Sequence, residues 1–519
     1  MRAGPQTLAA ICACLLASPG WPAATAADGL VRTRAGLVRG ATVDGIQRFL
    51  GMRYGADTAQ RRFQAPLPAP AWKGVRSATA YGPWCPQVAE VPEGQAVSED
   101  CLRLNLWTPA VDDSVRRPVL VYFHGGAYSN GAVTEPPYDG AALSRRGNVV
   151  VVTVHHRLNG FGYLYLGDYG ERYRDSGNAG MLDLILALRW VHENIARFGG
   201  DPARVTIFGQ SGGGAKCATL MAMPAARGLF QRVWTMSGQQ LSGRTLAHAR
   251  ETTLAVLTEL ELTPETLQQL ESMSLAQLSA AMRPGTWTPV VDGHALPRDP
   301  FEPAASPLSR DIPMVLGNTL DETTSLIGSA DPATFDLGWE QIAPKLRQHV
   351  AAFIGDLDPA EIVSDYRRWY PNATPAQVFF SASTAARSWK GMVLESERRA
   401  DQGGPTWIYH LNWRTPLDGG RWGAPHTLDL PLVFGNIAAS PYTAADAVAA
   451  KSLSDSMMAA LLAFARDGDP NAGVLPGWPR FELEQRQTMI FDQDTRVESD
   501  PRGQERRLFA PIRYVQPGS

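Results

Sequence analysis

The sequence predicts an α/β fold, with a large and mostly parallel central sheet that is covered by helices on both faces. Continuous apolar runs are typical of strands buried on both sides, and helical patterns lie between them. The apolar runs span residues 118–123, 149–154, 205–208, 233–236, 312–316 and 406–409. Because strand and helix alternate along the chain, we expect the strands to form one layered sheet.

The clearest predicted helix runs from Gly180 to Phe198, and the Gly-Gly-Asp-Pro stretch at 199–202 ends it. Its apolar residues recur at helical spacing: Leu184, Leu188, Val191 and Ile195. The first hundred residues have no long helical pattern, so we expect short antiparallel strands and loops there. Helix-rich insertions are predicted at about 245–310 and 330–400, where they would form walls over a site.

The composition is that of an ordinary globular protein. Of the 519 residues, 44% are hydrophobic and 19% are charged, and the net charge of -3 gives no support for nucleic acid binding. No linker, charge block or repeat divides the chain, so residues 27–519 are predicted to form one domain. There is no His-Glu-x-x-His motif, and we expect neither a metal nor a cofactor. The oligomeric state is left open.

Residues 1–26 are predicted to be a signal peptide. Arg2 supplies the positive charge, and the apolar run from Leu8 to Ala17, about ten residues, is too short to span a bilayer. The stretch Ala24-Thr25-Ala26 fits a cleavage site with small residues. We therefore expect an exported protein, secreted or periplasmic, that begins at Ala27. No later apolar run is expected to be long enough to span a membrane.

Three cysteines remain after the predicted cleavage: Cys85, Cys101 and Cys217. An exported protein can form disulfides, and Cys85 and Cys101 lie close together in a loop-rich stretch, where a bridge would close a small loop. Cys217 follows a predicted turn on an apolar helix, and we interpret it as a buried packing residue.

A serine lies on a predicted sharp turn between a strand and a helix. Ser211 is flanked by Gly209 and Gly213 in the pattern Gly-x-Ser-x-Gly, after the β-formers at 205–208 and before the helical stretch at 216–223. Such an elbow holds the hydroxyl clear of the backbone, and the glycines remove Cβ atoms that would clash. The five residues alone also fit a glycine-rich turn, but the flanking strand and helix favour a nucleophile.

A serine nucleophile needs a base, and the base needs an orienting acid. Three of the nine histidines lie well beyond the first of the insertions that follow Ser211. His349 lies in a helical stretch among charged residues, which favours a solvated face, and His410 lies in a predicted strand, which favours the core. His426 follows that strand in a loop, where catalytic residues are common.

Two carboxylates follow the predicted strand at 312–316. Either Asp321 or Glu322 could lie at the carboxyl edge of the sheet, where open α/β sheets place their sites. The alternative is an acidic pair at the start of a helix.

A loop suited to an oxyanion hole follows the strand at 118–123. The stretch His124-Gly125-Gly126-Ala127 has backbone N–H groups and no bulky side chain between the histidine and Tyr128. The N–H of Gly212, at the start of the helix after the serine, would supply a further donor.

These motifs resemble those of the type B carboxylesterases, the cholinesterase-like branch of the α/β-hydrolases. The resemblance covers nearly the whole mature chain. It includes the stretches at 53–55, 62–66, 85–87, 98–105, 178–183, 198–202 and 423–431. It implies an α/β-hydrolase fold and a serine carboxylic-ester hydrolase that acts on a small-molecule ester through an acyl-enzyme.

The resemblance also implies individual roles. Ser211 would be the nucleophile, His426 the base, and Glu322 rather than Asp321 the acid. The implied oxyanion donors are Gly126, Ala127 and Gly212. The implied disulfide joins Cys85 to Cys101, and Ser237 is expected to support the three catalytic side chains from behind.

One departure from the family concerns the substrate. The family commonly has a glutamate before the nucleophile, where this chain has Gln210, so we expect no preference for cationic esters. The alternatives are bulky or carboxylate-bearing natural-product esters of the fumonisin type, a lipase-like activity and, remotely, a non-catalytic cholinesterase-like binding protein. The expected pocket residues are Tyr128, Gln210, Trp287 and Phe434, although core packing is the commoner role of each aromatic residue alone.

Overall fold

The computed structural model describes residues 29–111 and 114–517, and the predicted signal peptide at 1–26 lies outside them. The strands are β1 Leu30–Arg32, β2 Leu37–Arg39, β3 Ala41–Val43, β4 Ile46–Arg53, β5 Val75–Ser77, β6 Arg103–Thr108, β7 Arg117–Phe123, β8 Val150–Val154, β9 Gly200–Gln210, β10 Arg232–Met236, β11 Met314–Thr319, β12 Thr406–Leu411, β13 Gln487–Phe491 and β14 Arg496–Ser499. All six predicted buried strands are present, as β7 to β12.

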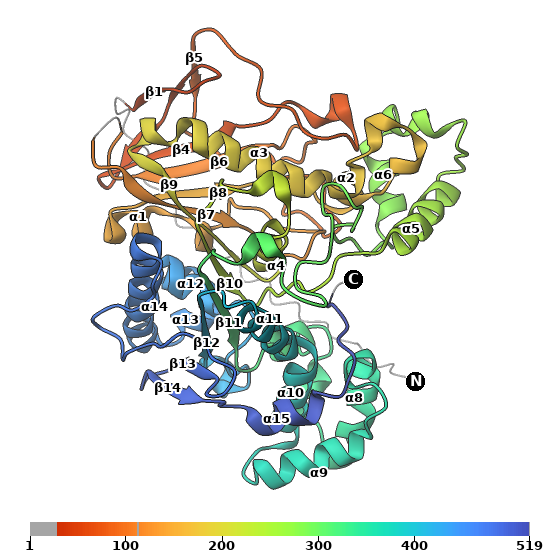
Figure 1. The fold of residues 1–519 in the computed structure, drawn as a ribbon, viewed down its shortest axis with the longest axis vertical. Coiled ribbons are helices and arrows are strands. Elements are labelled where there is room, and N and C mark those ends of the chain that lie inside the picture. The colour runs from red at the N-terminus through yellow and green to blue at the C-terminus, as the bar shows by residue number, and fades with distance from the viewer. Residues whose placement is uncertain (1–28, 112–113, 518–519) are drawn as a thin grey trace, which may run out of the picture.

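The α-helices are α1 Ala141–Gly147, α2 Asn159–Tyr163, α3 Ala179–Asn194, α4 Gly212–Leu220, α5 Leu246–Glu259, α6 Leu275–Met282, α7 Thr323–Leu326, α8 Trp339–Ile354, α9 Pro359–Trp369, α10 Pro375–Thr384, α11 Lys390–Asp401, α12 Asp429–Phe434, α13 Pro441–Ala444, α14 Ala447–Asp467 and α15 Gly503–Phe509. Some α-helices pack on the two faces of the large sheet, and others, such as α8 and α9, lie away from it (Figure 1). The predicted helix from Gly180 to Phe198 is α3 with a 3₁₀ turn at its end.

The strands of the large sheet follow the order β14-β13-β12-β11-β10-β9-β7-β8-β6-β4-β3. The pairs from β8 through β7, β9, β10, β11 and β12 to β13 are parallel, whereas the strands at both edges pair antiparallel. The sheet is therefore mostly parallel, as predicted. Near the N-terminus, β1, β2 and β5 form a separate small sheet in which one of the two pairings is parallel rather than antiparallel.

Both faces of the sheet are buried because alternate side chains point to opposite cores. Val119 and Val121 of β7 join the core that includes α3, whereas Leu120 and Tyr122 join the core that includes α12 and α14. This arrangement explains why β7 reads as one continuous apolar run. The loops at the carboxyl ends of the parallel strands all leave the sheet at the same edge.

Helix α14 corrects one expectation from the sequence. By length and composition it is apolar enough to cross a membrane, and 56% of its most apolar window is buried inside the fold. Met457, Leu461 and Phe464 are buried in the core that α14 shares with α12. The helix is therefore part of the hydrophobic core on that face of the sheet.

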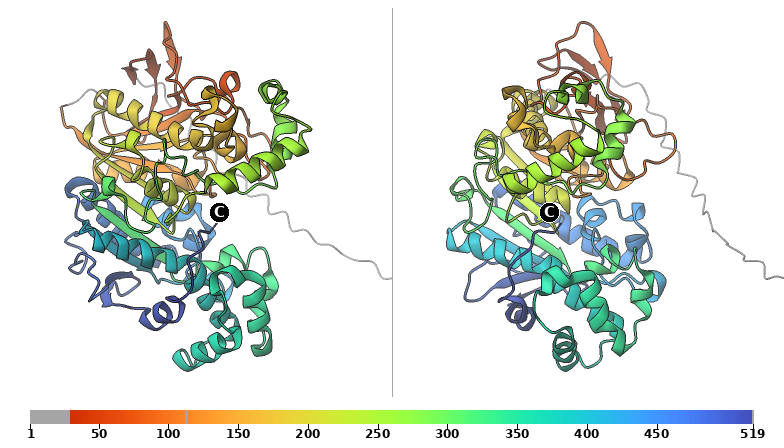
Figure 2. Two further views of the ribbon diagram at one scale, coloured as in Figure 1. Left: turned by 45° about the vertical axis from the view of Figure 1, so that its right-hand side comes forward. Right: turned by 90° about the vertical axis from the view of Figure 1, so that its right-hand side faces the viewer.

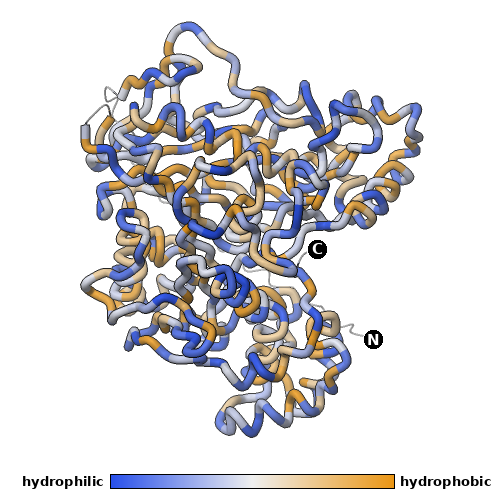
Figure 3. The backbone as a smooth tube through the Cα atoms, viewed as in Figure 1, coloured by the Kyte–Doolittle hydropathy of each residue, from blue (hydrophilic) through white to orange (hydrophobic). Residues whose placement is uncertain are grey.

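The two predicted helical insertions lie on either side of the C-terminal segment (Figures 1 and 2). Helices α5 and α6 belong to the first insertion, and α8 to α11 belong to the second. Hydrophobic and hydrophilic residues alternate along the second insertion (Figure 3), and α8 buries Ile342, Leu346 and Val350. Each insertion thus packs with one face and exposes the other.

The cysteines are arranged as predicted. Cys85 and Cys101 form a disulfide, and Cys217 is free and buried on α4.

Candidate active site

Ser211 occupies the turn between β9 and α4. Its φ of 56° and ψ of -128° are unusual for a residue with a side chain, and such strain is common at functional sites. The turn depends on its glycines: a Cβ atom on Gly209 would lie 2.3 Å from the carbonyl carbon of Gly213, and one on Gly213 would lie 1.9 Å from the carbonyl oxygen of Phe123. The glycines are therefore sterically required, as the sequence predicted.

His426 lies in the loop between β12 and α12, and its imidazole is held by Glu322. His426 Nδ1 forms a short hydrogen bond with Glu322 Oε2. Because Nδ1 donates its proton to the carboxylate, Nε2 keeps the lone pair that a general base uses. Nε2 lies 3.2 Å from the side-chain nitrogen of Gln210, the residue directly before Ser211, so the basic nitrogen faces the nucleophile turn.

Glu322 is fully buried, and both of its oxygens are hydrogen-bonded. Oε1 accepts bonds from Ser237 Oγ at 2.5 Å, from Asn318 Nδ2 at 2.9 Å and from the backbone N–H of Thr319 at 2.8 Å. Burial by itself would raise the pKa of this carboxyl, but His426 and these donors outweigh burial and lower the pKa to about 2. The carboxylate is thus charged at any pH near neutrality.

Asp321 has a different position from its neighbour. Its Oδ2 accepts a hydrogen bond from the N–H of Ala424 at 3.0 Å, and its own N–H donates to the carbonyl of Ala424 at 3.0 Å. Arg414 lies 3.6 Å from the same carboxylate oxygen. Asp321 therefore fastens the loop that carries His426, whereas Glu322 contacts the imidazole itself.

The three expected oxyanion donors come together from two loops. Phe123, at the end of β7, pairs with Gly209, so the loop after β7 runs beside the serine turn. A Cβ atom on Gly212 would lie 2.2 Å from the carbonyl oxygen of Ala127, which shows how closely the two backbones approach. Among the described residues, the N–H groups of Gly126 and Ala127 have no hydrogen-bond acceptor, so they can bind a negative oxygen.

A buried lysine is hydrogen-bonded to this loop. Lys216 Nζ, on α4, donates to the carbonyl of His124 at 2.9 Å and to the carbonyl of Ala127 at 2.8 Å. Burial lowers the pKa of Lys216 to about 7. Because the two carbonyls belong to the oxyanion loop, Lys216 fixes the direction of its N–H groups. Lys216 was not predicted from the sequence, although a lone lysine in an apolar helix indicates a buried side chain with specific partners.

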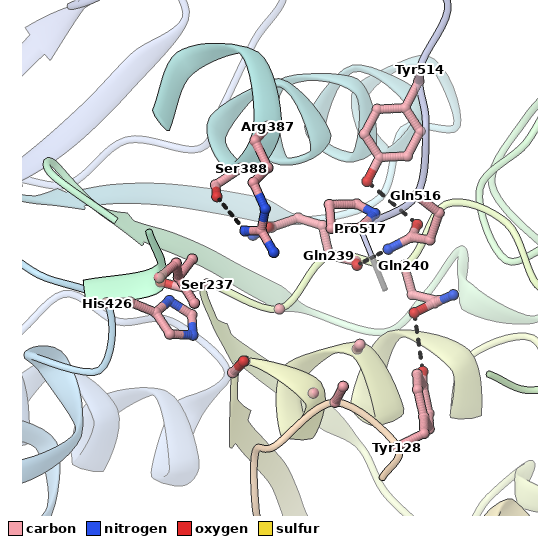
Figure 4. A pocket seen from close by; sticks show the side chains of 16 residues that line it. Tyr128, Ser237, Gln239, Gln240, Arg387, Ser388, His426, Tyr514, Gln516 and Pro517 are labelled. Atoms are coloured by element: carbon pink, nitrogen blue, oxygen red, sulfur yellow. Dashed lines mark hydrogen bonds between the residues drawn. The ribbon is translucent and has the colours of Figure 1, made fainter. Parts of the chain in front are cut away.

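These side chains border a cavity of about 120 Å³ (Figure 4). Its lining includes Ala127, Ser211, Gly212 and His426. Arg387, Ser388, Tyr514 and Gln516 lie across the cavity from His426 and Tyr128 (Figure 4). The facing side chains come from the second insertion and from the C-terminal segment, and the sequence analysis did not identify them. Gln239 and Gln240, which follow β10 at the carboxyl edge of the sheet, complete the wall.

The four expected pocket residues have different positions. Tyr128 lines the cavity and donates to Gln240 Oε1 at 3.0 Å, and Gln210 contacts His426. Gln210, Trp287 and Phe434 do not line it. Trp287 is buried in the core on one face of the sheet, and Phe434 packs against Tyr122 and Phe208 on the other. Both aromatic side chains thus belong to the hydrophobic cores rather than to the lining of the cavity.

The other two histidines lie away from the cavity. His410 is buried within β12, and His349 Nε2 lies 2.9 Å from Asp331 on the second insertion. Within the described residues, no group of three or more His, Cys, Asp or Glu side chains is arranged to hold a metal ion.

Comparison with known proteins identifies the family. Residues 27–509 match the model of the Carboxylesterase family. The chain belongs to that family. Its relatives include the para-nitrobenzyl esterase of Bacillus subtilis (strain 168), which is 34% identical over 507 residues, or 93% of this chain and 98% of the relative. The Fumonisin B1 esterase of Sphingopyxis macrogoltabida is 30% identical over 482 residues, or 87% of this chain and 85% of that protein.

Solved structures agree with the family assignment. A crystal structure of a Geobacillus stearothermophilus carboxylesterase matches with a TM-score of 0.82 and 36% identity, covering 93% of this chain and 100% of that one. This carboxylesterase therefore has the α/β-hydrolase fold and is a carboxylic ester hydrolase, as the sequence predicted.

Proposed function

We propose that this carboxylesterase cleaves its substrates through an acyl-enzyme on Ser211, with His426 as the base and Glu322 as the acid. The observation that carries the proposal is the position of His426, whose Nδ1 bonds to Glu322 while Nε2 faces the turn of Ser211. A neutral imidazole in this tautomer can accept a proton from the serine hydroxyl and deliver it to the leaving group.

The reaction runs in two halves. Ser211 Oγ attacks the ester carbonyl while its proton passes to His426 Nε2, and the N–H groups of Gly126, Ala127 and Gly212 bind the resulting oxyanion. The intermediate expels the alcohol, which takes the proton from His426. Water then attacks the acyl-serine, again with His426 as the base, and the acid product and free Ser211 are released.

Covalent labelling tests this proposal. A fluorophosphonate should add once to the wild-type protein, as measured by intact mass, and should not add to Ser211→Ala. The matched control is Ser237→Ala, because Ser237 also borders the cavity but has its hydroxyl bonded to Glu322; this variant should still be labelled. Labelling that persists in Ser211→Ala and is lost in Ser237→Ala would overturn the assignment.

We also propose that residues 1–26 are a signal peptide, that the carboxylesterase is exported and that residues 27–519 form one domain. The sequence features at residues 2–26 support cleavage, and the family match begins at residue 27. Sequencing the N-terminus of the exported protein should return Ala27 as the first residue, whereas a retained Met1 would refute the cleavage.

A further inference from the structure

Arg387 is a cation on the cavity wall that faces the nucleophile. It lies in a single π-helical turn, Ala385–Trp389, between α10 and α11. Such turns often occur at functional sites because they displace a side chain from the regular helical surface. The guanidinium extends from this helix toward the side of the cavity that holds Ser237 and His426 (Figure 4).

Several buried arginines of the fold pair with carboxylates or, as Arg399 does, donate to backbone carbonyls, and among the described residues Arg387 does neither. Arg62 pairs with Glu99 at 2.6 Å and Arg157 pairs with Asp183 at 2.6 Å, both in buried sites. Among the described residues, no ion pair includes Arg387, and its side-chain hydrogen bond is to Ser388 Oγ at 3.3 Å. A half-buried guanidinium without an anion is costly, because burial removes water that no carboxylate replaces.

The cavity offers this cation no negative charge. Its polar lining consists of amides, hydroxyls and the imidazole, with no aspartate or glutamate. Glu322 lies behind His426 with both oxygens already bonded, and Gln210 stands where the family commonly has a glutamate. Burial lowers the pKa of Arg387 while the charge of Glu322 opposes that effect. Arg387 therefore gives the lining of the cavity a positive charge that no carboxylate of the lining balances.

Building on the proposed function, we propose that Arg387 binds a carboxylate of the substrate, and that the preferred substrates are esters with a free carboxylate, such as monoesters of short dicarboxylic acids. The planar guanidinium matches a carboxylate with two parallel hydrogen bonds. A cavity of about 120 Å³ favours a short spacer between this carboxylate and the ester. Arg387 would thus select the substrate, whereas Ser211 and His426 would perform the chemistry.

The test compares two esters of the same shape. Monoethyl glutarate carries a carboxylate, and ethyl 4-carbamoylbutanoate replaces it with a neutral amide. Ethanol release gives kcat/KM for both esters. We expect the wild-type carboxylesterase to prefer the anionic ester, and Arg387→Met to lower the ratio of anionic to neutral kcat/KM on the order of 10- to 100-fold, mainly through KM.

Two further variants separate charge recognition from folding. Arg387→Lys keeps the charge without the planar fork and should retain part of the ratio. Arg367→Met removes a positive charge from the exposed surface of the same insertion, where Arg367 stacks on Trp339, and should leave both esters unaffected. Thermal melts verify that each variant is folded.

Each outcome decides one question. An unchanged ratio in folded Arg387→Met, or a wild-type preference for the amide, would overturn the role of Arg387 and leave the proposed function intact. Hydrolysis of 4-nitrophenyl acetate without hydrolysis of either ethyl ester would overturn the substrate class alone. Failure to hydrolyse any of the three esters would count against the proposed function itself.

Discussion

The two walls of the cavity are built in different ways. The catalytic wall consists of loops at the carboxyl ends of the parallel strands, with the loop at 124–127 after β7, Ser211 after β9, Glu322 after β11 and His426 after β12. The facing wall consists of Arg387, from a π-helical turn in an insertion, and of the C-terminal residues Tyr514 and Gln516.

The two walls also differ in how many of their charged groups have fixed hydrogen-bond partners. Glu322 uses both oxygens on fixed partners, whereas Arg387 has no carboxylate partner among the described residues. The catalytic groups are therefore held in position before the substrate binds. On the facing wall, the charge of Arg387 stays available to bind the substrate.

Removing the base should have the largest effect, because the catalytic wall acts as one unit. We expect His426→Ala to lower kcat by at least about 10³-fold and up to about 10⁶-fold, since neither the serine nor water can then be deprotonated. Thermal melts of the same preparation separate lost chemistry from lost protein. Near wild-type turnover by the folded variant would show that another group is the base.

The acid comes next, and the chain offers a matched control beside it. Glu322→Gln should lower kcat/KM by up to about 10⁴-fold, because the amide cannot stabilise an imidazolium or hold the correct tautomer. Asp321→Asn should cost far less, because Asp321 bonds to Ala424 rather than to the imidazole. The kcat/KM values of the two variants, measured side by side, test this. A nearly inactive Asp321→Asn together with an active Glu322→Gln would show that Asp321, and not Glu322, is the acid.

The pH dependence sharpens the same assignment. With a pKa lowered to about 2, Glu322 stays ionised above pH 3, so it should contribute no ionisation to the acid limb of kcat/KM above that pH. A folded-state pKa below the usual 4.5 means that the carboxylate stabilises the fold above that pH and loses this contribution as pH falls toward 2. An ionisation of Glu322 in the acid limb above pH 3 would contradict the assignment.

Lys216 should have an intermediate effect, because it positions the oxyanion loop without touching substrate. Lys216→Met should lower kcat on the order of 10-fold, less than the loss of an oxyanion donor, with KM little changed. Its folded-state pKa of about 7 lies below the usual 10.5, so wild-type stability should rise with pH between these values.

Melts from pH 7 to 10 check this, since Lys216→Met should lack that rise. The exposed Lys451→Met is the matched control and should behave as wild type. A Lys216→Met variant with unchanged kcat and an unchanged pH dependence of stability would remove the lysine from the catalytic wall.

The smallest effect is expected at Gln210, which contacts His426 and is not among the residues that line the cavity. Gln210→Glu should shift selectivity by a few-fold toward acetylcholine over its neutral isostere 3,3-dimethylbutyl acetate, because a carboxylate beside the serine attracts a cation. The ratio of the two kcat/KM values measures it. A strong preference of the wild-type protein for acetylcholine would contradict a positive cavity.

Most of the catalytic wall could be predicted from the sequence, because its geometry is local. The glycines around Ser211 permit the sharp turn between strand and helix that other residues would block. The continuous apolar runs predicted β7 to β12, with small differences at the ends of the strands. The choice of Glu322 over Asp321 came from family resemblance, since adjacent carboxylates look alike until the partners of each are known.

Which residues form the facing wall was decided only by the tertiary structure. Trp287 and Phe434 were expected in the pocket and lie in the two cores, while Arg387 and Gln516 gave no signal in the sequence. The physical reason is how far apart along the chain the residues lie that determine each feature. A turn depends on its own few residues, but the lining of a cavity depends on how insertions and a C-terminal segment, far apart in the chain, pack against one another above the sheet.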